Sequence, residues 1–205
     1  MTSAEDKAAL RRRLRAQRDA HVAGLPPAIR AIAFGIAPAP LAALMRRAKT
    51  VAAYSPVGSE ADPLRLLAQA AAMGCQTALP HVTGRAAAMR FIAWRPGGLL
   101  VAGPLGLVQP DTKGRDIAPD MILTPLVGFD RSLNRLGQGA AHYDRAFAAA
   151  PKALRIGIAW SAQETESIPA EAWDLPLDAV LTEREWITGP RIPSGVNGQS
   201  GEIGR

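Results

Sequence analysis

Residues 128–144 carry the side chains whose types and spacing are best suited to chemistry. Gly137 and Gly139 allow the backbone to approach a ligand closely. A helix expected to begin near His142 would point free backbone N–H groups at an anion. Arg135 adds a guanidinium that can hold a phosphate through two parallel hydrogen bonds. The pattern favours a phosphate or nucleotide site in this segment.

Asp144 falls in the first turn of the same helix and can offer carboxylate oxygens to a magnesium ion. The segment has no G-x-x-x-x-G-K-[ST] motif, which excludes a P-loop, and a dinucleotide fingerprint would need a small residue where His142 stands. Spacing alone leaves an equal alternative, an ordinary glycine turn that enters a helix with Asp144 as a favourable first-turn carboxylate.

The chain that must position these residues alternates short apolar segments with helical ones. We expect strands at residues 51–54, 77–79, 89–94, 121–124, 155–160 and 179–182. We expect helices at residues 3–22, 26–47, 62–74 and 143–149, the second interrupted by prolines. The alternation predicts an α/β fold: a single three-layer αβα domain with a mostly parallel sheet and the N-terminal helices packed on it.

In such a fold, ligands bind outside the carboxyl ends of the strands. That rule selects the loops that follow Tyr54, Leu123 and Trp160. We expect residues 1–188 to form the domain, and residues 189–205, which are rich in Gly, Ser and Asn, to form a disordered tail.

The N-terminal helix carries a basic face, because Lys7, Arg11, Arg15 and Arg18 recur at spacings of four, four and three. The whole chain of 205 residues has 24 Lys and Arg against 18 Asp and Glu, a formal charge of +6. This excess favours anionic partners such as nucleic acids, phosphates or polycarboxylates. No recognised nucleic-acid module accompanies it, so we expect no nucleic-acid partner, and a solvated basic surface is the alternative.

The composition narrows the class of protein further. The single cysteine, Cys75, excludes a disulfide framework and a multi-cysteine zinc site, and we expect it to be a buried, inert thiol. No apolar run approaches the roughly 20 residues of a membrane span, so no membrane partner is expected. No secretory signal is visible at the charged N-terminus. We therefore expect a cytoplasmic protein.

Several short motifs occur in a specific order and spacing along the chain. They are Lys7-Ala-Ala-Leu-Arg11, Tyr54-Ser-Pro-Val-Gly-Ser-Glu60, Leu79-Pro80, Gly106-Leu-Val-Gln-Pro110, Phe129-Asp-Arg131, Asn134-Arg-Leu-Gly-Gln-Gly139, Tyr143-Asp-Arg145, Ile156-Gly-Ile-Ala-Trp160 and Leu175-Pro-Leu-Asp178 with the run to Glu183. Each alone is weak. Their shared order resembles the 5-formyltetrahydrofolate cyclo-ligase family, also called methenyltetrahydrofolate synthetase, over most of the chain.

The resemblance implies an enzyme that depends on ATP and Mg²⁺ and converts 5-formyltetrahydrofolate to 5,10-methenyltetrahydrofolate, releasing ADP and phosphate. In the family's mechanism, the formyl oxygen attacks the γ-phosphoryl group of ATP, and nitrogen 10 of the folate displaces phosphate from the imidate phosphate that results. No protein nucleophile is required, which agrees with the lack of a convincing Ser/His/Asp or Cys/His set in this sequence. ATP and 5-formyltetrahydrofolate are the partners implied, and we expect a monomer.

The resemblance also implies roles for individual residues. Arg135 and Asp144 would be catalytic. The nucleotide would be bound by Lys7, Arg11, Arg135, Leu136, Gly137, Gln138, Gly139, Ala140, Ala141, His142 and Tyr143. Ser55 and Glu60 would contact the folate, and Asp144 and Asp178 would bind magnesium.

The sequence departs from the family's pattern inside the nucleotide loop. Ala140 and Ala141 stand where the family usually has glycine, and a left-handed conformation at either would cost roughly 1–2 kcal/mol. His142 replaces a residue that is usually aromatic, and next to phosphate it would tend to protonate. The two alanines keep an alternative open: a non-catalytic descendant that binds nucleotide or folate and has a regulatory role.

Four other side chains receive weaker expectations. Trp94 and Trp160 could wall a pterin ring, but core positions are the preferred interpretation. His21 and His81 have no companions at metal-ligand spacing, and we expect both at the surface.

Overall fold

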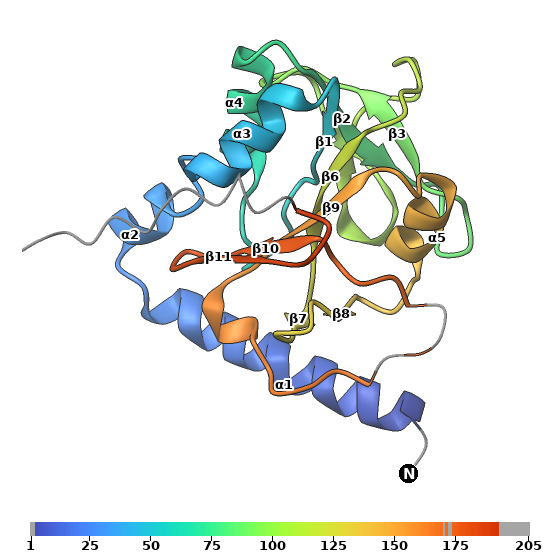
Figure 1. Ribbon diagram of the computed structural model, residues 1–205. Coiled ribbons are helices and arrows are strands. Elements are labelled where there is room, and N and C mark those ends of the chain that lie inside the picture. The colour runs from blue at the N-terminus through green and yellow to red at the C-terminus, as the bar shows by residue number, and fades with distance from the viewer. Residues whose placement is uncertain (1–2, 170, 172–173, 193–205) are drawn as a thin grey trace, which may run out of the picture.

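The computed structural model describes residues 3–169, 171 and 174–192, and within them a twisted sheet forms the centre of the molecule (Figure 1). The helices are α1 Ser3–Gly24, α2 Pro27–Ile32, α3 Ala39–Arg47, α4 Leu64–Ala72 and α5 His142–Ala149, with short 3₁₀ turns η1 Pro104–Gly106 and η2 Ser161–Gln163. The strands are β1 Thr50–Ala52, β2 Gln76–His81, β3 Arg90–Ala93, β4 Val101–Ala102, β5 Val108–Gln109, β6 Met121–Pro125, β7 Gly128–Phe129, β8 Arg135–Leu136, β9 Leu154–Ile158, β10 Ala179–Leu181 and β11 Trp186–Thr188.

Seven of the described strands pair in the order β11-β10-β9-β6-β1-β2-β3. The five inner strands are parallel, and the edge strands β3 and β11 are antiparallel to their neighbours. The inner strands are short and almost wholly buried, which is why they read in the sequence as continuous apolar runs. The predicted mostly parallel sheet is therefore confirmed.

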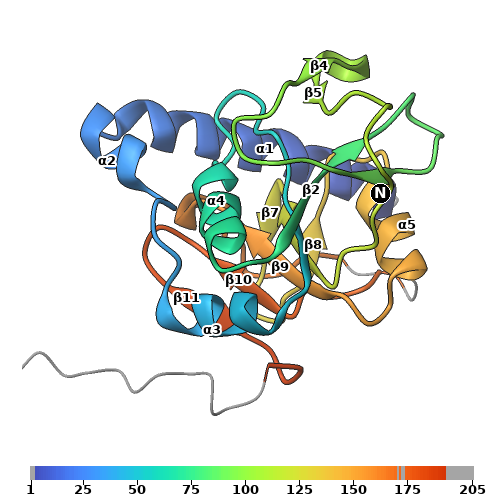
Figure 2. The same cartoon turned by 90° about the horizontal axis from the view of Figure 1, so that it is seen from above.

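Helices cover both faces of this sheet (Figure 2). Leu41 of α3 and Leu66 of α4 pack with sheet residues of one face, including Leu123. Phe147 of α5 packs with Ile122 on the other face. This arrangement confirms the predicted three-layer αβα architecture. The single helix expected over residues 26–47 is divided into α2 and α3, because proline disrupts a continuous helical hydrogen-bond ladder.

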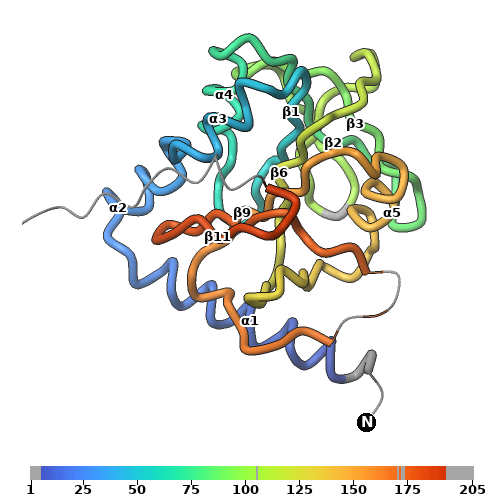
Figure 3. The backbone as a smooth tube through the Cα atoms, viewed as in Figure 1, coloured from blue at the N-terminus to red at the C-terminus, as the bar shows by residue number. Residues whose placement is uncertain are grey.

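Helix α1 does not lie on a face of the sheet. It runs past the loops at the carboxyl ends of the strands, beside the β7–β8 hairpin and η2 (Figure 3). Leu14 packs with Val127, Leu136 and Ile168, and any side chain at Gly128 would collide with it. The helix therefore covers the end of the sheet where ligands bind in parallel α/β folds.

Three further sequence-based expectations differ from the structure. Ile192, in the segment expected to be a disordered tail, is 4% exposed and belongs to the core. Residues 193–205 lie outside the described part of the chain. His81 is buried, at 6% exposure, because its strand is covered by the segment that contains Gln109. Residues 128–136, which are outside the expected strands, form the β7–β8 hairpin.

Among the described residues, no helix is both long enough and apolar enough to cross a bilayer.

Candidate active site

The β7–β8 hairpin follows β6 at the carboxyl end of the sheet and is held by the buried carboxylate of Asp130. Its oxygens accept hydrogen bonds from the backbone N–H and the side-chain amide of Asn134, both at 3.0 Å. They also accept the backbone N–H of Ile168 at 2.9 Å. A buried carboxylate with three donors is well satisfied, and it fixes the tight turn that leads into Arg135.

Arg135 is fixed from several sides, and its side chain is only 6% exposed. It donates to Asp144 of α5, and its guanidinium carbon lies 5.3 Å from the ring centre of Phe147 and 5.9 Å from that of Tyr143. Its buried Nε atom has no hydrogen-bond partner among the described residues. Arg135 and Asp144 line a small pocket together with Asp174. The pocket combines one buried cation with two carboxylates.

The loop between Arg135 and α5 contacts the basic face of α1. Arg11 donates from Nε to the carbonyl oxygen of Gly137 at 2.8 Å, and Arg15 donates to the side-chain oxygen of Gln138 at 2.5 Å. Gly139 has a φ of 97°, a left-handed conformation that favours glycine, and it lies against the Arg11 guanidinium. The basic face of α1 therefore packs on this loop and is not simply a solvated surface.

Ala141 adopts the left-handed conformation, with φ 53° and ψ 20°, at the residue that precedes α5. Ala140 is not in that conformation. One of the two alanines noted in the sequence thus carries the backbone strain expected of a position that favours glycine. The conformation turns the chain so that α5 begins at His142 with its first-turn N–H groups free of side-chain caps.

Lys7 reaches the same pocket from the start of α1. Its Nζ atom lies 3.1 Å from a carboxylate oxygen of Asp174 and 3.5 Å from one of Glu171. Burial acts to raise the pKa of Asp174, but the backbone N–H of Glu171 and the Lys7 ammonium outweigh it and hold that pKa below its ordinary value. Lys7 is therefore positioned by two carboxylates, neither of which the sequence singled out.

The loop after β1 lies on the other side of the Gly-rich loop. Glu60 accepts the backbone N–H of Val57 at 3.0 Å on one oxygen and the side-chain amide of Gln138 at 3.0 Å on the other. Ser55, the other residue expected to contact folate, is half-buried in the same loop. The structure therefore brings Glu60 into direct contact with the Gly-rich loop.

The same β1 loop is anchored to the body of the domain at Ser59. Arg18 donates from Nε to the Ser59 hydroxyl at 2.8 Å, and this hydroxyl in turn donates to Asp19. The indole N–H of Trp160 donates to the Ser59 carbonyl at 3.0 Å. Trp160 is buried against Phe34, so it is a core residue that also holds this loop.

Two tyrosines lie close to Glu60. Removal from water raises the pKa of the Tyr143 phenol, and the Glu60 carboxylate raises it further. Burial raises the pKa of Tyr54 in the same way, again with a contribution from Glu60, and its hydroxyl donates to the Ala61 carbonyl at 2.5 Å. Both phenols therefore stay protonated. Tyr54 donates its one O–H to Ala61, whereas Tyr143 can act as a neutral donor to a ligand.

His142 occupies the first turn of α5 with its Nδ1 atom 3.0 Å from Arg145. Burial and the charge of Arg145 lower the pKa of His142. The direction is opposite to the protonation expected next to a phosphate, because here a cation and not an anion faces the ring. Arg145 also donates to the carbonyl oxygens of Arg85 and Ala87, which ties α5 to the segment after β2.

The two carboxylates expected to bind magnesium have different surroundings. The Asp144 side chain is 35% exposed and opens on the pocket of Arg135. The Asp178 side chain is 1% exposed, accepts the backbone N–H of Arg155 at 2.8 Å, and lies 3.6 Å and 3.3 Å from the guanidiniums of Arg155 and Arg191. Within the described ranges, no three His, Cys, Asp or Glu side chains gather as a metal site. The structure does not bring Asp144 and Asp178 together.

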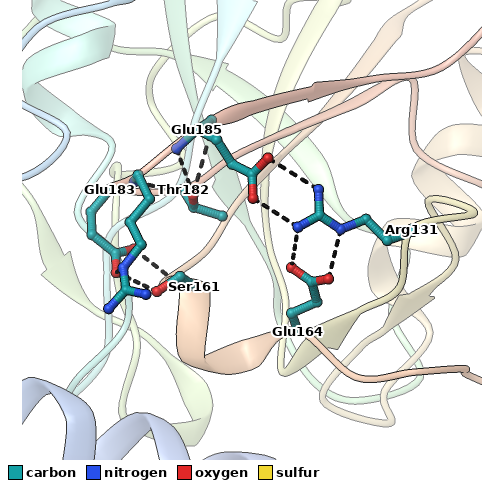
Figure 4. A network of polar contacts seen from close by, with 7 residues as sticks. Arg131, Ser161, Glu164, Thr182, Glu183 and Glu185 are labelled. Atoms are coloured by element: carbon teal, nitrogen blue, oxygen red, sulfur yellow. Dashed lines mark hydrogen bonds and ion pairs between the residues drawn. The ribbon is translucent and has the colours of Figure 1, made fainter.

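An arginine outside the expected site joins three loops at the carboxyl end of the sheet. Figure 4 shows Arg131, in the turn between β7 and β8, between the carboxylates of Glu164 and Glu185. The four nitrogen–oxygen distances lie between 2.6 and 3.0 Å. The two glutamates follow β9 and β10, and Glu183 nearby accepts from Ser161. This network braces the hairpin that carries Arg135.

Sequence reasoning missed Asp130, Glu171, Asp174 and the contacts of Arg15. Asp130 belongs to the motif Phe129-Asp-Arg131, and this membership was the only sequence signal for it. Glu171 and Asp174 lie in an irregular segment, where no periodicity indicates that they would meet Lys7.

Comparisons with known proteins point to one family. A model of the "5-formyltetrahydrofolate cyclo-ligase family" matches residues 3–183. The 5-formyltetrahydrofolate cyclo-ligase of Escherichia coli K12 is 34% identical over 142 residues, which cover 66% of this chain and 78% of that protein. The enzyme of the same name from Mycolicibacterium smegmatis is 36% identical over 163 residues, covering 74% and 82%.

Solved structures share the fold. A 5,10-methenyltetrahydrofolate synthetase from Mycoplasma pneumoniae superposes with a TM-score of 0.65 at 23% identity, covering 87% of this chain and 99% of that one. The NMR structure of the Aquifex aeolicus 5,10-methenyltetrahydrofolate synthetase gives 0.63 at 26% identity, with coverages of 92% and 93%. The family match spans most of the described residues, and the chain belongs to the 5-formyltetrahydrofolate cyclo-ligase family.

Proposed function

We propose that this protein converts 5-formyltetrahydrofolate to 5,10-methenyltetrahydrofolate at the expense of ATP, in the presence of Mg²⁺, with release of ADP and phosphate. The observation that carries the proposal is the 3.0 Å hydrogen bond between Gln138 and Glu60. This bond joins the Gly-rich loop, which would bind the phosphates, to the Glu60 carboxylate, which can accept hydrogen bonds from the N–H groups of a pterin. Family membership supports the same reaction.

The nucleotide side of the site would be formed by α1 and residues 135–143. Arg135 has a buried Nε without a partner among the described residues, so a phosphate oxygen would satisfy a donor that is otherwise orphaned. Lys7 and Arg11 add positive charge from α1, and Lys7 keeps a third N–H donor after pairing with its two carboxylates. The free N–H groups at the start of α5 would face the same anion.

The folate side would be formed by the loop after β1. Each Glu60 oxygen already accepts one N–H, and each retains a second lone pair for a donor of the ligand. Ser55 lies in the same loop. The neutral hydroxyl of Tyr143, whose pKa is raised by burial, would supply a further donor near the junction of the two substrates.

Asp144 fits a magnesium ion that arrives with ATP, because Mg²⁺ commonly binds one or two carboxylates together with substrate phosphates and water. Its side chain is partly exposed, and only one of its oxygens is engaged by Arg135 in the described structure. Asp178 is closed in a pair with two arginines and would have to leave them to take part. When bound, magnesium would offset charge on the phosphates.

The reaction needs no protein nucleophile. The formyl oxygen attacks the γ-phosphorus, ADP leaves, and an imidate phosphate forms on the folate. Nitrogen 10 then attacks the formyl carbon, the carbon–oxygen bond breaks, and phosphate leaves with the formyl oxygen while nitrogen 10 loses its proton. The protein's part is to align the two substrates and to surround the transferred phosphoryl group with Arg135, Lys7 and backbone N–H groups.

The test is turnover by purified protein. With 5-formyltetrahydrofolate, ATP and magnesium together, we expect the methenyl chromophore to appear with one phosphate released per product. Omission of any one component should abolish the signal. Folded protein that gives no chromophore with all three present would overturn the proposed reaction.

A second candidate is a protein that binds nucleotide or folate without turnover. The observation that favours it is the strained left-handed Ala141 inside the nucleotide loop. Binding of both ligands without product would support this candidate, and restored turnover in Ala141→Gly would identify the alanine as the cause.

A further inference from the structure

The side chain of Gln138 forms a bridge between α1 and the loop after β1. Its oxygen accepts from Arg15 at 2.5 Å, and its nitrogen donates to Glu60 at 3.0 Å. The two partners have opposite charge, so only one orientation of the amide satisfies both. A cation and a carboxylate therefore fix a side chain that is otherwise exposed on a Gly-flanked loop.

The bridge determines how Glu60 is presented. The backbone N–H of Val57 holds one carboxylate oxygen at 3.0 Å, and Gln138 holds the other. With one donor on each oxygen, the carboxylate plane is set, and one lone pair on each oxygen is left for two parallel N–H donors. Without Gln138, only one oxygen would be fixed and the carboxylate could rotate.

The same residue belongs to the loop that would surround ATP. Residues 137–139 carry two glycines around Gln138, and the contacts of this loop with α1 are the Arg11 bond to Gly137 and the Arg15 bond to Gln138. A nucleotide that orders this loop would hold Gln138 in place against Glu60. The Glu60 carboxylate would then already be ordered when the folate arrives, so folate binding would not lose the free energy needed to order it.

We propose that Gln138 is a positioning residue that couples nucleotide binding to folate binding through Glu60. This inference rests on the proposed function for the identity of the two ligands. Linkage makes the coupling reciprocal: ATP strengthens folate binding by the same factor by which folate strengthens ATP binding. No contact between Gln138 and either substrate is needed.

The experiment measures this coupling factor by titration calorimetry on the full-length protein. 5-Formyltetrahydrofolate is titrated with and without a saturating, non-hydrolysable β,γ-imido analogue of ATP and magnesium. For the wild type we expect the analogue to lower the folate Kd by about fivefold or more, within the usual range of coupling between sites. Because the factor is a ratio within one variant, a uniform loss of affinity does not change it.

Three variants separate positioning from structure. Gln138→Met has a similar shape and neither hydrogen bond, so its factor should fall to about one. Gln138→Glu keeps the acceptor for Arg15 but turns a carboxylate toward Glu60, so the analogue should weaken folate binding. Gln17→Met, the same change at an exposed position of α1, is the matched control and should keep the wild-type factor.

A wild-type factor of one, or an unchanged factor in Gln138→Met, would overturn the coupling role. Wild-type protein that binds neither ligand would overturn this inference together with the proposed function. Wild-type protein that binds both with positive coupling but forms no product would contradict only the proposed turnover.

Discussion

Arg11 donates a 2.8 Å hydrogen bond from its Nε atom to the carbonyl oxygen of Gly137, across 126 residues of sequence. The bond uses the inner edge of the guanidinium and leaves its terminal nitrogens for another acceptor. Burial and the neighbouring Arg15 lower the pKa of Arg11, but a guanidinium still stays protonated at any ordinary pH. One side chain thus holds the loop and also presents positive charge to a ligand on it.

Arg11→Met should weaken ATP binding far more than it weakens the fold. We expect the KM for ATP to rise at least about tenfold, equivalent to roughly 1.4 kcal/mol, because both the loop contact and a charge are lost. The free energy of unfolding should fall by no more than about 1.5 kcal/mol, the usual range for one hydrogen bond. Steady-state kinetics and urea denaturation measure the two effects.

Arg12→Met is the control for this change. Arg12 is the next residue on α1 and is exposed, so its loss should leave the KM for ATP within about twofold, as is usual for surface substitutions. Equal effects of the two substitutions would mean that only the overall charge of the helix matters.

Ala141→Gly should stabilise the protein. The left-handed conformation at φ 53° costs alanine roughly 1–2 kcal/mol, and glycine removes this strain. Glycine is also more flexible in the unfolded chain, which lowers the stability gained by about 0.4–1 kcal/mol. We expect a net gain of about 0.5–1 kcal/mol in the free energy of unfolding. Ala140→Gly, at a residue outside the left-handed region, should be neutral or destabilising. A gain in stability for Ala141→Gly and none for Ala140→Gly, measured by chemical denaturation, would confirm where the strain lies.

The sequence predicted the sheet well because its inner strands are buried on both faces and appear as apolar runs such as residues 121–124. It also predicted the Gly-rich loop, since glycine at 137 and 139 is a local signal. The position of α1 could not be derived in the same way. The sequence pattern of a basic helix face is the same whether the face is solvated or packs on a loop 126 residues away. Only the fold shows that Arg11 contacts Gly137.

Contacts that join irregular segments were the other part that sequence patterns could not show. Asp174 meets Lys7 from a segment without periodicity. Asp178 lies at the edge of a buried strand, where a charged side chain needs a partner. Its partners proved to be Arg155 and Arg191, and no sequence spacing relates these three residues.

Asp174 should make the free energy of unfolding fall at acidic pH. Its pKa in the folded state lies below the ordinary value, because the Glu171 N–H and Lys7 outweigh the opposing effect of burial. The unfolded chain therefore binds the proton more tightly. The stabilisation is complete above the unfolded pKa of about 3.9 and is lost as pH falls through the lower folded pKa.

Asp174→Asn should accordingly flatten the pH dependence of the unfolding free energy between about pH 5 and pH 3. Lys7→Met should flatten it only in part, because the Glu171 N–H still lowers the Asp174 pKa, and the double variant should resemble Asp174→Asn. Additive effects in denaturation at several pH values would show that Lys7 and Asp174 act independently.

Asp144→Asn and Asp178→Asn should separate a magnesium carboxylate from a buried ion-pair partner. At Asp144 the amide keeps one oxygen for Arg135, and the side chain is partly exposed, so we expect a loss of no more than about 1–2 kcal/mol of stability. Turnover should fall steeply, and the magnesium concentration for half-maximal activity should rise, because the carboxylate proposed to hold the ion is gone.

At Asp178 the expected order of effects is reversed. Its side chain is 1% exposed, and its replacement leaves the buried Arg155 without a full counter-charge, so the fold should lose about 3 kcal/mol or more. The magnesium requirement of the remaining folded protein should stay that of the wild type. If Asp178→Asn instead folds normally and needs more magnesium, the carboxylate must leave its arginines when ATP binds, and Asp178 then joins Asp144 as a ligand of the ion.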